Sequence, residues 1–401
     1  MTSFPELDSS TPSTTGWRML LALAVVFVML ATTGWTAIRH HGGDMDPRAR
    51  ELASWREGRF DGHRLPDPYA PPPVLQRFFT TLDTRQRARL TARYPLVVGN
   101  LNGAPIKLRY RANRLALIRA REVERRRTTS TQLTPLGREN ATRRMQRYAS
   151  LLRADRQVIA FDPAGSGRVA EVFGDLEHAR HVAVVVPGVD TDILTFQKTR
   201  RRYTAPVGMA RSVYQAERSL EPHGANAVIA WADYTAPVGT GLDAATGKLA
   251  AEGALRLRAF VTGLPDEAAV TLLCHSYGSV VCGVAARDLD PSVTDIAVAG
   301  SPGMRAGHVS DFGTRARVWA MRDGNDWIAD VPNLEVGGLG HGADPVAEGF
   351  GARRLSAAGA DGHSGYFVPG TESVSNFAKL GIGAIHSVTC ADDDDCTADA
   401  G

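Results

Sequence analysis

Short apolar runs alternate with longer amphipathic stretches from position 157 onward. The runs are Gln157–Phe161, Arg168–Phe173, His181–Val186, Asn226–Trp231, Ala269–Cys274, Thr294–Ala299 and Ala316–Ala320. Continuous apolar runs of this length are typical of strands that helices cover on both faces. The sequence 162–165 (DPAG) favours a hairpin between the first two runs. The alternation of strands and helices therefore predicts an α/β fold with a mostly parallel, doubly wound sheet.

The segment before position 157 has the hydrophobic spacing of helices instead. We expect helices over 74–93, 113–127 and 138–153, with one short helix within 47–60. Further helices are expected over 249–264, 277–288 and 371–385, and residues 351–357 form a weak candidate for the last strand. The sequence thus predicts a helical extension in front of the sheet.

The N-terminus carries one uncharged run, from Met19 to Ile38. About 20 apolar residues suffice for a helix to cross the hydrocarbon core of a bilayer. Trp17 and Trp35 lie near its ends, where amphipathic rings favour the membrane interface. We favour an uncleaved single-pass anchor over a signal peptide that is removed, which would make the protein secreted. Either reading places the body of the protein outside the cytoplasm.

These patterns divide the 401 residues into segments. We expect a polar tail (1–16), a hydrophobic helix (17–38), a linker (39–73), an α/β domain (74–388) whose helical part is 74–156, and an acidic tail (389–401). The net charge of +3 is too small to indicate a nucleic-acid partner. The arginines between positions 109 and 156 are interspersed with glutamates, so we interpret them as a solvated helix face.

A polar motif, HSYG at 275–278, directly follows the apolar run 269–274. A serine at a sharp strand-to-helix turn holds its hydroxyl exposed above the sheet, and the crowded turn needs small residues two positions away on each side. Gly278 meets this need, and Cys274 stands where glycine is usual. We therefore predict that Ser276 is a catalytic nucleophile, against the alternative that the motif is only a tight turn.

A serine nucleophile needs a histidine base, which in turn needs a carboxylate to orient it. In chain order the acid should follow a later strand, and the histidine should come last. The loop after Ala320 offers Asp326, which we favour over Asp323 and more strongly over Asp330. His363 lies at the expected place for the base, with His341 as the alternative.

Two backbone amides are candidate donors to a developing oxyanion. Tyr277 begins the helix after the serine, where amides point toward negative charge. Val189 follows Gly188 in the loop after the run His181–Val186, and we expect its amide to be the second donor, although this loop could be an ordinary turn. His275 should point away from the hydroxyl and pack beneath the turn. This set of groups predicts acyl transfer from an ester or thioester.

The chain contains four cysteines. Cys390 and Cys396 bracket four aspartates near the C-terminus, where a small disulfide-closed loop is plausible in an oxidising compartment. We interpret Cys274 and Cys282 as small buried apolar residues rather than a redox pair. No spacing of Cys, His and acidic residues is typical of a zinc or calcium site. We expect neither a metal nor a cofactor.

Three further blocks of the sequence stand out. They are Leu82, Tyr94-Pro95, Val98–Pro105, Arg109 and Ala112–Arg114; Val185–Gly188 with Cys274–Ser279; and Gly300–Met304 with His363–Tyr366. Together these blocks resemble an actinobacterial α/β-hydrolase family long labelled a domain of unknown function. The resemblance covers about residues 70–370. It implies that the Gly99–Arg114 segment and its helices belong to the same unit as the sheet, and that the chemistry is hydrolysis of an undefined natural substrate.

Residues and resemblance together predict a serine hydrolase that acts on a carboxylic ester or thioester through Ser276, Asp326 and His363. The expected partners are a small acyl substrate and, through the N-terminal helix, a membrane. The alternative from a different functional class is a catalytically silent binding or scaffolding module on the cell surface, because a fold alone does not prove function.

Overall fold

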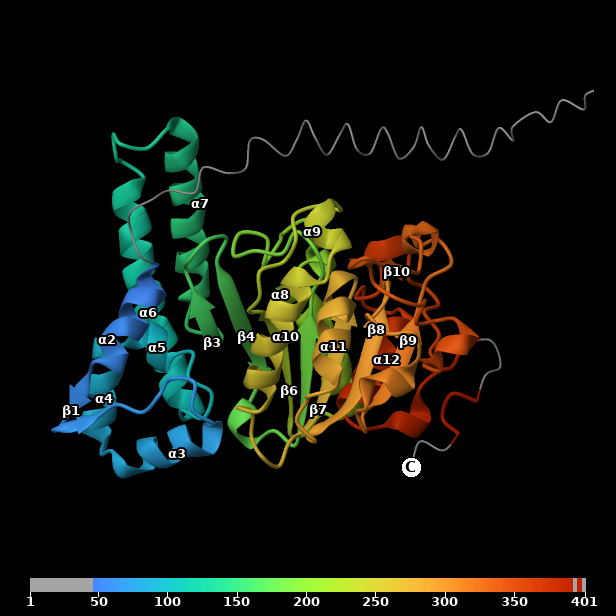
Figure 1. Ribbon diagram of the computed structural model, residues 1–401, viewed down its shortest axis with the longest axis horizontal. Helices are drawn as coiled ribbons and strands as arrows, with labels where there is room; N and C mark the ends of the chain where they lie inside the picture. Colours follow the sequence, from blue (N-terminus) through green and yellow to red (C-terminus); the bar gives the residue numbers. More distant parts are fainter. Residues whose placement is uncertain (1–45, 392–394, 399–401) are drawn as a thin grey trace, which may run out of the picture. The chain divides into compact units, whose positions relative to one another are not determined.

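The computed structural model describes residues 46–391 and 395–398, and those from Pro47 onward belong to one compact unit. Its centre is an eight-stranded sheet of order β12-β9-β8-β7-β5-β6-β4-β3 (Figure 1). The strands are β3 Gln157–Asp162, β4 Arg168–Gly174, β5 His181–Val186, β6 Asn226–Ala232, β7 Ala269–His275, β8 Val293–Ala299, β9 Arg317–Met321 and β12 Arg353–Arg354. The hairpin β3–β4 is antiparallel, β4 pairs antiparallel with β6, and the remaining pairs are parallel. The prediction of a mostly parallel α/β sheet is confirmed.

Helices cover both faces of this sheet. The helices of this part are α8 Pro206–Leu220, α9 Leu242–Ala245, α10 Lys248–Val261, α11 Tyr277–Ala286 and α12 Glu372–Gly381. One hydrophobic core joins the sheet to α10 and α11, and a second core joins the opposite face to α8 and α12. Because both faces are buried, strands such as β5 and β6 are apolar at nearly every position.

The helical extension lies beside the β3 edge of the sheet (Figure 1). It consists of α2 Pro47–Arg56, α3 Pro72–Thr81, α4 Thr84–Arg93, α5 Pro95–Val98, α6 Ile106–Arg127 and α7 Pro135–Leu151. The expectation of one helix over 74–93 is wrong, because Asp83 begins a new helix there. The Asp83 carboxylate accepts a hydrogen bond from the backbone N–H of Gln86, and the Gln86 side-chain oxygen accepts one from the backbone N–H of Asp83. This reciprocal pair is a capping box.

A third hydrophobic core holds this extension together, with Trp55, Phe79 and Tyr94 buried in it. Trp55 and Leu65 come from the segment that we expected to be a linker, 39–73. From Pro47 onward that segment is therefore packed structure. Its apolar residues are too sparse to produce a clear periodic signal, and they become buried only against α3, α4 and α5.

Short elements complete the described chain. Two small hairpins are β1 Arg59–Phe60 with β2 His63–Arg64, and β10 Glu335–Val336 with β11 Leu339–Gly340. The 3₁₀ turns are Leu176–His178, Arg202–Thr204, Val309–Phe312, Trp327–Asp330, Glu348–Phe350, Gly362–Ser364 and Ile385–Ser387. The predicted membrane helix at 17–38 lies outside the described residues. Among the helices that are described, none has the length and apolar character needed to span a bilayer.

Two disulfides are present. Cys390 and Cys396 are bonded, as the sequence suggested. Cys274 and Cys282 are buried, as expected, but they also form a disulfide, so the prediction that they are not a pair was wrong. The bond joins the end of β7 to the middle of α11 and thereby spans the turn that contains Ser276. Both sulfur atoms lie in the core between α11 and the sheet, which explains why their surroundings look apolar in the sequence.

Removing this disulfide is expected to destabilise the protein. Cys274 and Cys282 are separated by 8 positions, and closing a loop of this size restricts the unfolded chain by about 2–3 kcal/mol. The double substitution Cys274→Ala/Cys282→Ala should therefore lower the free energy of unfolding by about that amount in urea titrations. An unchanged urea midpoint in the double variant would show that the bond adds no stability.

Candidate active site

The turn from β7 into α11 places Ser276 in an unusual backbone conformation. Its φ is 54° and its ψ is −128°, a region that residues with a side chain rarely adopt outside strained functional turns. Close packing enforces the turn: a Cβ atom on Gly278 would lie 2.3 Å from the Val186 carbonyl oxygen, so only glycine fits there. The hydroxyl is thus fixed at the carboxyl end of a central strand.

The structure brings Ser276, His363 and Asp326 into one hydrogen-bonded line. The His363 Nε2 atom lies 2.9 Å from the Ser276 Oγ atom. The Nδ1 atom of the same ring lies 2.8 Å from Asp326 Oδ1 and 3.1 Å from Oδ2. Asp326 follows β9, and His363 lies in the 3₁₀ turn Gly362–Ser364. These contacts have the geometry needed for a base to take the serine proton while a carboxylate orients the base.

Asp326 is held in place by further donors. The Tyr366 hydroxyl donates to Oδ2 at 2.6 Å, and the Ile328 amide donates to Oδ1 at 2.9 Å. Burial alone would raise the pKa of Asp326, but the hydrogen bonds from His363, Tyr366 and the Ile328 amide outweigh it, so the pKa is lowered. Asp326 is therefore ionised at neutral pH and can stabilise a positive charge on His363. Sequence reasoning gave Tyr366 no role, because its ring meets the carboxylate only after two distant loops pack together.

The other two aspartates of the loop do not contact the His363 ring. Asp323 Oδ2 accepts from the backbone amides of Asn325 at 3.0 Å and Gly362 at 2.8 Å. It thereby ties the β9 loop to the turn that contains His363. Asp330 is exposed at the surface. Of the three candidates, only Asp326 stands in line with the histidine.

His341, the alternative base, lies elsewhere. Its Nε2 atom is 2.7 Å from the Ala244 carbonyl oxygen, and its ring packs edge-on against the Tyr277 ring with the centroids 5.7 Å apart. His275 lies beneath the turn, as expected, and its Nε2 atom is 2.7 Å from the His363 carbonyl oxygen. The ring of Trp327, which we did not single out, lies against His363 with the centroids 4.7 Å apart.

The environment of His275 predicts a pH-dependent stability. Burial, reinforced by the nearby His363, lowers the pKa of His275 to about 4, whereas an unfolded histidine titrates near 6.5. As the pH falls from about 6.5 to about 4, the unfolded state therefore binds a proton that the folded state does not. This difference should remove up to about 3 kcal/mol of stability by pH 4.

The measurement is urea unfolding between pH 7 and pH 4, with His275→Gln as the comparison. The variant cannot titrate, and its amide can still donate to the His363 carbonyl. It should lose less stability than the wild type over this range, and equal losses in both proteins would contradict the assignment.

The loop after β5 lies against the serine, on the side where the oxyanion donor was expected. A Cβ atom on Gly188 would lie 2.7 Å from the Ser276 Cβ atom and 3.0 Å from Oγ. The buried Tyr234 hydroxyl donates to the Pro187 carbonyl at 2.6 Å and holds this loop. Outside the helix and strand ladders of the described chain, the amides of Val189 and Tyr277 make no backbone hydrogen bond. Both therefore remain candidates for binding an oxyanion.

Substituting Gly188 is expected to impair the site directly. In Gly188→Ala the new methyl group would collide with Ser276, so the loop or the serine must shift by several tenths of an ångström. Displacing one oxyanion donor typically costs about 100- to 1000-fold in kcat, and we expect an ester-hydrolysis assay to show a loss of this size. Gly241→Ala is the matched control, because a Cβ there meets nothing within 4 Å. Wild-type kcat in Gly188→Ala would show that this loop does not shape the site.

No group of three or more His, Cys, Asp or Glu side chains could hold a metal ion within the described ranges. What the site offers instead is a serine, a histidine and a carboxylate in line, with two amides beside them. This arrangement is suited to acyl transfer.

Comparison with known proteins points the same way. A family model described as alpha/beta hydrolase matches residues 162–336, which include Ser276 and Asp326. The uncharacterized protein Rv2079 of Mycobacterium tuberculosis is 28% identical over 381 residues, covering 80% of this chain and 57% of the relative. The present chain thus spans little more than half the length of that protein.

For a second relative, the match covers a larger share of the relative's own length. The uncharacterized protein Rv0963c of Mycobacterium tuberculosis is 30% identical over 200 residues, which are 47% of this chain and 73% of the relative. The family model covers the strand, turn and helix around Ser276, and the parallel sheet has the corresponding architecture. The chain belongs to the alpha/beta hydrolase family.

Proposed function

We propose that this protein is a serine hydrolase that cleaves carboxylic esters or thioesters through a covalent acyl-enzyme. The observation that carries the proposal is the continuous line of hydrogen bonds from Asp326 through His363 to Ser276. The positive φ of Ser276 supports it further, because strained residues of this kind concentrate at functional turns.

In the proposed mechanism, His363 Nε2 accepts the proton of Ser276 while Oγ attacks the substrate carbonyl carbon. The Val189 and Tyr277 amides donate to the resulting oxyanion, and ionised Asp326 stabilises the protonated imidazole. His363 then gives its proton to the leaving alcohol or thiol as the carbonyl re-forms. Water, deprotonated by the same histidine, attacks the acyl-enzyme and releases the carboxylic acid and free Ser276.

The surroundings of the site support an apolar acyl group. Trp327 packs on His363 and is 48% exposed. Val238 and Leu242, 84% and 55% exposed, lie on the segment whose Gly239 amide donates to Asp190 next to Val189. We propose that these side chains contact the acyl chain, since contiguous exposed apolar surface is typical of ligand-binding sites.

We further propose that the hydrolase body works outside the cytoplasm, anchored by the uncharged run Met19–Ile38 or released after its cleavage. The two disulfides support this location, because such bonds persist mainly in oxidising compartments. The membrane is then a partner through the N-terminal segment, and the small acyl substrate is the partner of the site.

A panel of p-nitrophenyl esters with acyl chains from acetate to decanoate tests the function. The full chain should hydrolyse them, with kcat/KM rising with acyl length. If the folded protein hydrolyses no ester or thioester of the panel, the proposed hydrolase activity fails, and a catalytically silent binding module becomes the better account.

A further inference from the structure

A second site-like feature lies between the helical extension and the sheet. It is a cavity of about 380 Å³, a size typical of small-ligand sites, bounded by α2, α3, α5 and α10. Most of its walls are apolar, and the larger apolar side chains are Leu52, Tyr69, Leu75, Leu101, Leu255 and Phe260. Tyr69 and Leu255 are 67% and 60% exposed, so the cavity has an apolar mouth. No residue of the proposed triad lines it.

The cavity contains a buried cation, Arg109 of α6, which is only 1% exposed. The guanidinium lies over the Phe260 ring, 5.8 Å from its centroid. Within the described residues its side chain makes one hydrogen bond, from Nε to the Gly99 carbonyl at 3.4 Å, and forms no ion pair. Burial lowers the pKa of Arg109 to about 10, so the side chain remains charged at neutral pH.

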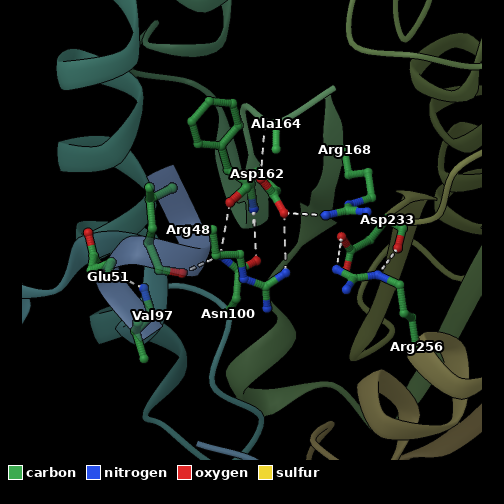
Figure 2. A network of polar contacts seen from close by, with 11 residues as sticks. Arg48, Glu51, Val97, Asn100, Asp162, Ala164, Arg168, Asp233 and Arg256 are labelled. Carbon is green, nitrogen blue, oxygen red and sulfur yellow. Dashed lines mark hydrogen bonds and ion pairs between the residues drawn. The ribbon is translucent and has the colours of Figure 1, made fainter. Parts of the chain in front are cut away.

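The other charged groups drawn around the cavity are engaged with one another, as Figure 2 shows. Asp162, at the end of β3, accepts from Arg48 at 3.3 Å and from Arg168. Asp233, directly after β6, accepts from Arg256 of α10 at 2.5 Å. Asp233 is the carboxylate whose charge acts on Arg109, but it already forms an ion pair with Arg256. Within the part of the chain that the structure describes, Arg109 thus has no anionic partner of its own.

An unpaired buried charge is costly, and proteins ordinarily pair or remove it. A buried guanidinium without an anionic partner favours a bound anion, and its planar group matches a carboxylate in two parallel hydrogen bonds. We propose that this cavity binds an amphiphilic carboxylate, with its carboxylate on Arg109 and its apolar chain along the walls that open between Tyr69 and Leu255. The site is separate from the triad and goes beyond the proposed hydrolysis.

The probe is octanoate, and the test is isothermal titration calorimetry with the full chain in phosphatidylcholine nanodiscs. Octanamide, which has the same chain without the charge, is the control ligand. We expect saturable binding of octanoate and at least about 30-fold weaker binding of octanamide, because one partner of a buried charge pair is then missing. Arg109→Met should weaken octanoate binding by at least the same factor, whereas Arg111→Met, an exposed residue of the same helix, should not.

Thermal unfolding without ligand separates a binding role from a structural one. Arg109→Met removes an unpaired charge, and the Gly99 carbonyl keeps its hydrogen bond from Asn113 at 2.9 Å. The Tm of this variant should therefore equal or exceed that of the wild type. A second variant, Ala259→Trp, keeps Arg109 and fills the cavity where Ala259 lines it. This variant should also lose octanoate binding.

Three results would overturn the proposal: octanoate and octanamide bind equally, Arg109→Met lowers the Tm, or binding survives in Arg109→Met but disappears in Ser276→Ala. The last result would place the carboxylate at the triad. Ester hydrolysis is measured independently in the same preparations, so failure of this site is distinguishable from failure of the proposed hydrolase activity.

Discussion

Ser276→Ala is expected to lower kcat for ester hydrolysis by about 10⁴- to 10⁶-fold, since loss of a serine nucleophile removes the covalent pathway as a whole. The folded state should survive, because in the described structure the Ser276 hydroxyl bonds only to His363 and alanine fills most of the side-chain volume. Residual hydrolysis would come from the oxyanion amides and from binding alone.

The matched control is Ser279→Ala in the same helix. Ser279 is buried, and its hydroxyl donates to the Cys274 carbonyl at 3.4 Å, away from His363. We expect its kcat within a few-fold of the wild type, measured with the same ester by stopped assay. Equal activities in Ser276→Ala and wild type would remove Ser276 from the mechanism.

Asp326→Asn is expected to lower kcat by about 10⁴-fold, the size of effect that follows when the histidine loses its orienting carboxylate. An asparagine amide can stabilise the wrong imidazole tautomer, and it carries no charge to balance a protonated His363. The asparagine oxygen can still accept from the Ile328 amide, and the Tyr366 hydroxyl can accept from the new amide group in place of donating to Oδ2, so the fold should be retained. Circular dichroism checks this, and steady-state kinetics measures the effect.

Asp323→Asn is the control for the competing assignment. Its Oδ2 atom holds the amides of Asn325 and Gly362, and an asparagine oxygen can accept both. We expect less than about a 10-fold loss, because only loop positioning is perturbed. If Asp323→Asn shows the larger loss of the two, the acid of the triad has been assigned to the wrong residue.

Much of the fold follows from local patterns. The apolar runs of β5, β6 and β7 are continuous because both faces of the sheet are covered, and that signal is readable without any tertiary knowledge. The boundary between α3 and α4 at Asp83 also has a local sequence signal, which is an Asp followed three residues later by Gln. Residues from Pro47 to 73 are different, because Trp55 and Leu65 become core only through partners distant in the sequence.

The site shows the same division. The turn at Ser276 could be predicted because its strand, turn and helix are contiguous, whereas choosing among three aspartates requires knowing which one faces His363. The Cys274–Cys282 bond depends on the approach of α11 to β7, and the environment of Arg109 depends on its burial over the Phe260 ring, which is distant in the sequence. Neither arrangement can be predicted from the spacing of residues in the sequence.

The most direct test of the central claim is covalent labelling with a fluorophosphonate, followed by mass spectrometry of the digested full chain. The account predicts stoichiometric labelling, with the adduct on the peptide that contains Ser276 and much slower labelling in His363→Ala. Folded wild-type protein that does not react, or an adduct on another residue, would contradict it.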